Sequence, residues 1–136
     1  MSKIVFLFSF LLLFVKCTTQ SVEKEKFKND TSKIERTVFG TYEGKIPCAD
    51  CEGVLENLEL KNNYTFILKS TYKGRAEETS FVEQGKYVVD SGKIVLFPDD
   101  STGDYPKYLI VNHSLEKLDM NGERIKSVLN YKLRKR

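Results

Sequence analysis

The sequence predicts an all-β protein, a small eight-stranded antiparallel up-and-down barrel. From residue 36 onward the chain consists of short runs rich in β-branched and aromatic residues. Asn, Gly, Asp and Pro interrupt these runs about every ten residues, and no stretch has sustained helical periodicity. Antiparallel strands with one apolar face close most economically into a barrel, although a two-sheet sandwich would give the same pattern.

Eight segments have the composition of strands. They lie near residues 37–45, 54–61, 64–72, 81–89, 93–97, 107–112, 115–120 and 125–133. Turn-forming residues separate them, and Asn121-Gly122 is the sharpest hairpin signal in the chain. Alternation along the strands places apolar side chains on one face. We expect bulky residues to fill the interior, among them Phe66, Leu68, Tyr87, Leu96 and Leu109.

The N-terminus is typical of an export signal. Lys3 precedes an apolar run over residues 4–15, which is shorter than the roughly 20 residues of a membrane-spanning helix. Cys17 follows directly, as does the acylated cysteine of a bacterial lipoprotein, and a lipid there would attach the protein to a membrane surface. Cleavage near Thr19, which would discard Cys17, is the alternative.

The chain is therefore expected to divide into a signal peptide over residues 1–16, a polar tether over 17–35 and a β-barrel domain over 36–136. Without Lys3 and Lys16, the 22 basic residues fall to 20 against 19 acidic ones. So balanced a charge gives no electrostatic reason to expect nucleic acid as a partner.

The most distinctive loop is Pro47-Cys48-Ala49-Asp50-Cys51-Glu52-Gly53, between two predicted strands. Pro and Gly at its ends stop regular structure, which predicts a tight loop on a sheet scaffold. This motif, the strands through Leu58-Glu59-Leu60 and Tyr64-Thr65-Phe66, and the segment Phe81-Val82-Glu83-Gln84-Gly85-Lys86-Tyr87 resemble the N-terminal domain of the NlpE copper-resistance lipoproteins. The resemblance covers residues 39–133, nearly the whole predicted domain.

The resemblance implies a lipocalin-like barrel, anchored by lipid in the bacterial envelope and connected with copper tolerance and envelope stress signalling. It implies an outer-membrane location facing the periplasm, and a stress-signalling protein as partner. Longer family members add a C-terminal OB-like domain, for which we expect no room within these 136 residues.

Three chemistries are open to Cys48 and Cys51. In the oxidising envelope the two cysteines can form a disulfide. As thiolates they are soft ligands that select copper(I), a cofactor the fold does not require. Redox catalysis of the thioredoxin type would need a helix after the motif, and the residues from Gly53 onward have a strand pattern instead.

Few other residues support a metal site or catalysis. Asp50 and Glu52 are hard oxygen ligands, His113 is the lone histidine and lies in a predicted turn, and Met120 is the lone methionine after the signal. A closed zinc site is not expected from this set. With no G-x-S-x-G motif and no assembled acid pair or triad, we expect a protein that is not an enzyme.

Two functions follow from these observations. The first is an envelope sensor whose state depends on the Cys48–Cys51 loop. The second is a lipocalin-like carrier of a small apolar ligand, which would need a cavity of about 300 Å³ or more inside the barrel. The filled interior expected above favours the sensor.

Overall fold

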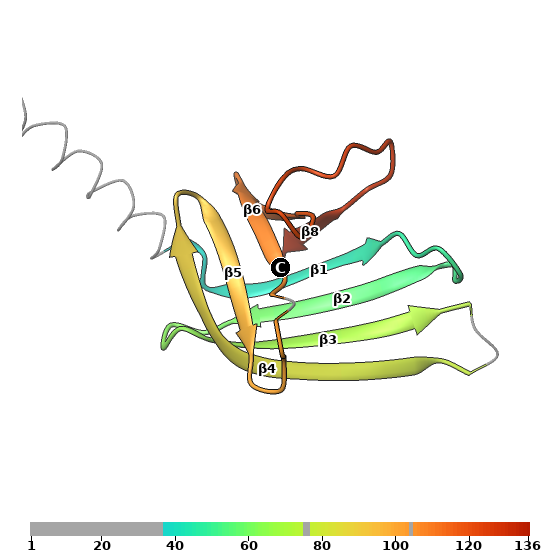
Figure 1. The fold of residues 1–136 in the computed structure, drawn as a ribbon, viewed down its shortest axis with the longest axis horizontal. Helices are drawn as coiled ribbons and strands as arrows, with labels where there is room; N and C mark the ends of the chain where they lie inside the picture. Colours follow the sequence, from blue (N-terminus) through green and yellow to red (C-terminus); the bar gives the residue numbers. More distant parts are fainter. Residues whose placement is uncertain (1–36, 75–76, 104) are drawn as a thin grey trace, which may run out of the picture.

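The strands of the computed structural model, which describes residues 37–74, 77–103 and 105–136, form a closed barrel in chain order (Figure 1). They are β1 (Gly40–Ile46), β2 (Gly53–Leu60), β3 (Thr65–Lys73), β4 (Thr79–Asp90), β5 (Lys93–Pro98), β6 (Lys107–Val111), β7 (Ser114–Lys117) and β8 (Lys132–Lys135). Each strand pairs antiparallel with the next along the chain. The all-β barrel is therefore confirmed.

The barrel closes where β8 returns to β1. This seam is short, because only Tyr42 and Glu43 of β1 pair with Lys135 and Arg134 of β8. Beyond it the backbone N–H of Arg136 donates to the carbonyl oxygen of Thr41 at 2.9 Å.

The up-and-down topology separates the loops into two sets. The short turns β2–β3, β4–β5 and β6–β7 lie at one end of the barrel, near the point where the described chain begins. The loops β1–β2, β3–β4, β5–β6 and β7–β8 lie at the other end, which we call the rim. Figure 1 shows the β1–β2 loop at one end of the long strands, opposite the end where β1 begins.

Bulky apolar side chains fill the barrel. The buried set is Val38, Tyr42, Ile46, Leu58, Leu60, Phe66, Leu68, Tyr87, Ile94, Leu96, Tyr108, Leu115 and Leu133. The predicted inward positions Phe66, Leu68, Tyr87 and Leu96 all belong to it.

The prediction for Leu109 was wrong. Tyr108 is fully buried instead, and Leu109 is only partly buried. In β6 the sequence Lys-Tyr-Leu-Ile-Val has apolar side chains on both faces, so alternation cannot tell which face is inside.

The predicted last strand, 125–133, was also wrong. A turn does form at Asn121-Gly122, where the N–H of Gly122 donates to the carbonyl of Asp119 at 3.0 Å. Only one isolated bridge, Leu118 with Arg124, follows it. Residues 125–131 then form a loop, in which the partly buried Tyr131 packs against the core, and Leu133 is the first fully buried residue of this stretch.

The predicted signal peptide (1–16), the candidate lipidation site Cys17 and the predicted tether (17–35) lie outside the described residues. Within the part of the chain that the structure describes, no helix has the length and apolar character needed to cross a membrane.

Candidate functional site

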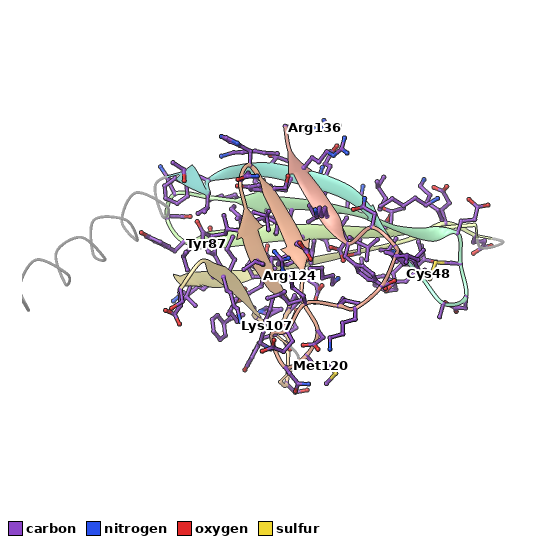
Figure 2. All side chains as sticks on the ribbon, turned by 90° about the horizontal axis from the view of Figure 1, so that it is seen from above. Cys48, Tyr87, Lys107, Met120, Arg124 and Arg136 are labelled. Atoms are coloured by element: carbon purple, nitrogen blue, oxygen red, sulfur yellow. A yellow bond between two sulfur atoms is a disulfide. The ribbon has the colours of Figure 1, made fainter. Side chains whose placement is uncertain are left out.

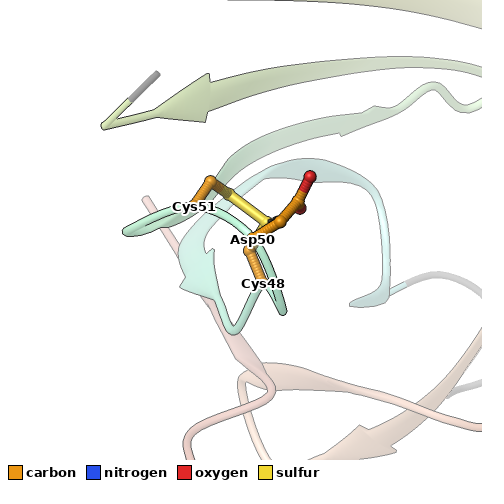
Figure 3. The surroundings of a disulfide bond; sticks show 3 residues. All are labelled: Cys48, Asp50 and Cys51. Atoms are coloured by element: carbon orange, nitrogen blue, oxygen red, sulfur yellow. Dashed lines mark hydrogen bonds between the residues drawn. A yellow bond between two sulfur atoms is a disulfide. The ribbon is translucent and has the colours of Figure 1, made fainter. Parts of the chain in front are cut away.

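The β1–β2 loop holds Cys48 and Cys51 at the rim of the barrel. The two residues form a disulfide, with an S–S distance of 2.10 Å and a Cα–Cα distance of 5.4 Å (Figure 3). Both cysteines are partly buried, and Ala49 and Asp50 between them are exposed. The sulfurs are therefore held at the surface, within reach of solutes.

The loop is fixed at its second half to the end of β3. The backbone N–H of Glu52 donates to the carbonyl oxygen of Lys73 at 3.0 Å, which extends the β2–β3 ladder up to the residue after Cys51. Gly53 has a φ of 146°, a conformation that disfavours other residues, and a Cβ there would press on the side chain of Lys45. This glycine lets the chain leave the disulfide and enter β2 at once.

Asp50 is the charged group closest to the sulfurs. Its Oδ1 lies 3.3 Å from Cys48 Sγ, which carries no hydrogen in a disulfide, so the pair is in contact without a hydrogen bond. Ligand atoms of Cys48, Asp50 and Cys51 lie within 4.8 Å of one another, and within the described ranges no other group of three such residues is as close. The donor set is thus two sulfurs and one carboxylate.

Oxidation state decides what this set can bind. The disulfide offers no thiolate, whereas reduction would give two soft ligands of the kind that copper(I) prefers. Asp50 is a hard ligand and adds negative charge rather than a favourable copper(I) bond. Gly53 begins β2 two residues after Cys51, so in the described chain no helix N-terminus faces the sulfurs as in thioredoxin-type motifs.

The other candidate ligands lie elsewhere. His113 is in the β6–β7 turn, at the end of the barrel opposite the rim, where its carbonyl accepts from the N–H of Lys135 at 3.2 Å. Met120 is in the β7–β8 loop with 77% of its surface exposed, and Figure 2 shows it well apart from Cys48. Neither joins the cysteine pair.

Sequence reasoning missed a buried polar group inside the barrel. Glu56 of β2 is only 3% exposed, and Tyr108 Oη donates to its Oε2 at 3.0 Å. Lys117 of β7 forms an ion pair with Glu56 Oε1. Burial raises the pKa of Tyr108 well above its usual value of 10.0, and the carboxylate of Glu56 raises it further. Each oxygen of this carboxylate thus has a donor.

Comparisons with known proteins identify the family. Residues 42–128 match the family described as the NlpE N-terminal domain. This chain belongs to that family. Lipoprotein NlpE of Escherichia coli is 37% identical to it over 94 residues, which are 68% of this chain and 39% of the E. coli protein. This NlpE-family chain therefore matches about two fifths of that relative's length.

Solved structures agree with the family assignment. A crystal structure from Shewanella oneidensis, described as that of a lipoprotein, has a TM-score of 0.61 and 39% identity, and covers 72% of this chain and 88% of that one. The crystal structure of the Cpx pathway activator NlpE from E. coli has a TM-score of 0.57 and 35% identity, and covers 68% of this chain and 48% of that one. The NlpE-type barrel is thus shown by sequence and by fold.

Among the described residues, bulky side chains occupy the interior of this NlpE domain. Side chains from all eight strands are packed against one another, and the largest fully buried ones are Tyr87, Tyr108 and Phe66. A hollow of about 400 Å³ lies beneath the β7–β8 loop, between Glu116 of β7 and Lys132 of β8, and Val128 and Leu129 form part of its wall. Its position outside the core differs from that of a lipocalin ligand site.

Proposed function

We propose that this NlpE-family chain is a lipid-anchored envelope protein that senses copper(I) and oxidation state through the Cys48–Cys51 loop. The observation that supports the proposal is the position of the cysteine pair. The two sulfurs lie in a six-residue loop at the rim, part-exposed, with the Asp50 carboxylate 3.3 Å from Cys48 Sγ. The barrel beneath serves as a rigid support for this loop.

The Cys48–Cys51 pair would act as a switch with two states. In the oxidised state the S–S bond leaves neither sulfur free to bind a metal. Two electrons and two protons from a thiol reductant would break that bond and give two thiols, and copper(I) would then displace both protons to bind two thiolates. The residues that would hold copper(I) are Cys48 and Cys51.

A change in the oxidation state of the β1–β2 loop can alter the adjoining strands of the sheet. Because Glu52 N–H is bonded to Lys73 of β3, a change in the loop at Cys51 acts directly on the β2–β3 ladder. Gly74, which follows β3, lies against the Glu52 side chain and has a φ of 78°. The β1–β2 and β3–β4 loops would therefore respond together.

Membrane attachment and partner are part of the proposal. Acylation of Cys17 would place the domain on a membrane surface, which for this family we propose to be the outer membrane on its periplasmic side. The E. coli relative is described as an activator of the Cpx pathway. We propose an envelope stress-signalling protein as the partner of this chain, in a sensing role rather than a catalytic one.

The carrier function is the less favoured candidate. It needs an enclosed apolar cavity, and the positions that would line one are occupied by packed core side chains such as Phe66 and Tyr87.

The experiment replaces both sulfurs. Cys48→Ser with Cys51→Ser should keep the fold, because the chain-entropy estimate for so small a loop is only about 2 kcal/mol. Cells that depend on this protein should lose their protection from copper when they carry the double variant. Asp50→Asn is the matched control, because it removes the nearby charge and keeps both sulfurs, and it should retain most of the protection. Full protection by the double serine variant would refute the proposal.

A further inference from the structure

The longest strand, β4, extends beyond its neighbour β5. It pairs with β3 over Thr79–Lys86 but with β5 only over Gly85–Asp90. Among the described residues, no strand pairs with the other side of residues 79–84. Figure 1 shows this half of β4 at the lower margin of the sheet, with β3 on one side of it only.

The hydrogen-bond pattern identifies the backbone groups on that open side. Tyr87 N–H donates to Tyr64 O on the β3 side at 2.9 Å, and Gln84 O accepts from Asp99 N–H on the opposite side at 2.9 Å. In an antiparallel strand the N–H and C=O of one residue point the same way, and successive residues alternate. Ser80 and Val82 therefore point their N–H and C=O groups away from β3, toward the open side.

Two large apolar side chains lie exposed along this open edge. Phe81 is 54% exposed on the inner face, where its ring meets that of Tyr72 edge-on at 5.8 Å, and Val82 is 64% exposed on the outer face. Proteins commonly protect open edges with Pro, Lys or other charged side chains, and Glu83 is the one such residue between Thr79 and Gln84. An added strand would cover both side chains and use the free backbone groups.

The charges around this edge indicate the partner. Among the described residues, the carboxylates that border it are Glu77, Glu83, Asp99 and Asp100. In the same part of the chain, the nearby cations are Lys69, opposite Val82 in β3, and Lys86 of β4, while Lys73 is already paired with Glu78 at 2.7 Å. The excess of carboxylates favours a basic strand. Two copies of this edge would bring carboxylates together, which disfavours self-association.

We propose that the β4 edge Thr79–Gln84 binds an extended basic segment of a partner protein by β-strand addition. Main-chain hydrogen bonds to Ser80 and Val82 would supply affinity, and contacts with Phe81, Val82 and Glu83 would supply specificity. This interaction goes beyond the copper and redox function and does not depend on the cysteines.

Hydrogen exchange on the full chain tests the edge and its occupant together. In the free protein the amides of Ser80 and Val82 should exchange rapidly, and those of Phe81 and Glu83 slowly, because only the latter pair with β3. The probe is a seven-residue peptide that alternates Lys and Val. It should slow exchange at Ser80 and Val82 at least tenfold, and the same peptide with Glu in place of Lys should bind at least tenfold more weakly.

Two controls separate edge pairing from other contacts. Val82→Pro removes the outward N–H without breaking a bond to β3 and should weaken peptide binding at least tenfold, whereas Val82→Thr keeps that N–H and should bind like the parent. Should Val82→Pro fail to fold, a peptide N-methylated at alternate residues tests the same bonds on the unaltered protein, and it should not bind.

Three results would overturn the proposal. The first is unchanged exchange at Ser80 and Val82 with saturating peptide. The second is equal binding of the N-methylated peptide. The third is protection of both amides without peptide, together with a doubled mass in solution, which would assign the edge to a second copy of the chain.

Discussion

At the scale of single residues, Glu56 is the position where the barrel departs most from an ordinary apolar core. A buried carboxylate is costly unless both oxygens have partners, and here Tyr108 and Lys117 provide them. Glu56 comes from β2 and its two partners from the adjacent strands β6 and β7, so the contacts join β2 to strands that do not pair with it. We infer that this group fixes how the two halves of the barrel pack on each other.

Substitution of Tyr108 tests that role. Tyr108→Phe would leave Glu56 Oε2 without its donor inside the barrel, and we expect a loss of about 1–3 kcal/mol in the free energy of unfolding. Tyr87→Phe is the matched control. It removes a hydrogen bond to a neutral acceptor, the carbonyl of Lys61 at 2.8 Å, and should cost only about 1 kcal/mol. Urea denaturation compares the two, and an equal or smaller loss for Tyr108→Phe would contradict the role given to Glu56.

The sequence predicted where some functional residues lie in the fold and failed to predict others. The Pro-Cys-x-x-Cys-x-Gly pattern located the rim loop, because Pro and Gly stop strands on either side of it. Glu56 was missed although a signal existed, since it has the same parity in its strand as Leu58 and Leu60, which are buried. Its partners could not be predicted, because Tyr108 and Lys117 are 52 and 61 residues away in sequence.

At the scale of elements, the seam between β1 and β8 is the narrowest part of the wall. Gly44 makes this approach possible, because a Cβ at that position would overlap the carbonyl oxygen of Lys132. Glu43 adds an ion pair with Arg136 across the seam, at 2.6 Å. The barrel therefore depends on one residue without a side chain for its closure.

Gly44→Ala should open the seam. We expect a loss of about 1–3 kcal/mol in the free energy of unfolding, because the added methyl group must displace the β8 backbone. Thr41→Ala, on the same strand, is the control and should cost less than about 1 kcal/mol. Faster hydrogen exchange at Arg136 N–H, which bonds to Thr41 O, would locate the damage. Parent-like stability and exchange in Gly44→Ala would refute this account of the closure.

The strands themselves were largely predictable, and the failure at the last one has a physical cause. Alternation and turn residues located the first seven strands correctly. Each of these strands pairs along much of its length with a neighbouring strand. Residues 125–131 have apolar side chains at alternating positions too, but Leu129 is 57% exposed and Val128 fully so. A period-two pattern marks a strand only where a neighbouring strand exists to pair with it, and sequence alone does not show that.

At the scale of the whole molecule, the barrel is a filled support that presents loops at one rim. Strand alternation predicted that bulky side chains face the interior, and this packing favours the proposed sensor over the carrier. The rim carries the Cys48–Cys51 loop, and the open edge of β4 begins beside the β3–β4 loop at the same end. The proposed copper or redox signal and the proposed protein partner would therefore meet within one region of this NlpE-family domain.

Intact mass spectrometry with a free-thiol count, on full-length protein purified from the envelope, tests the central claim most directly. The protein as isolated should carry acyl mass on Cys17 and show no free thiol at Cys48 or Cys51. After reduction it should gain two thiols and then bind one copper(I), and the double serine variant should bind none. Free thiols at both positions in the isolated protein, or equal copper(I) uptake by the double serine variant, would contradict the account.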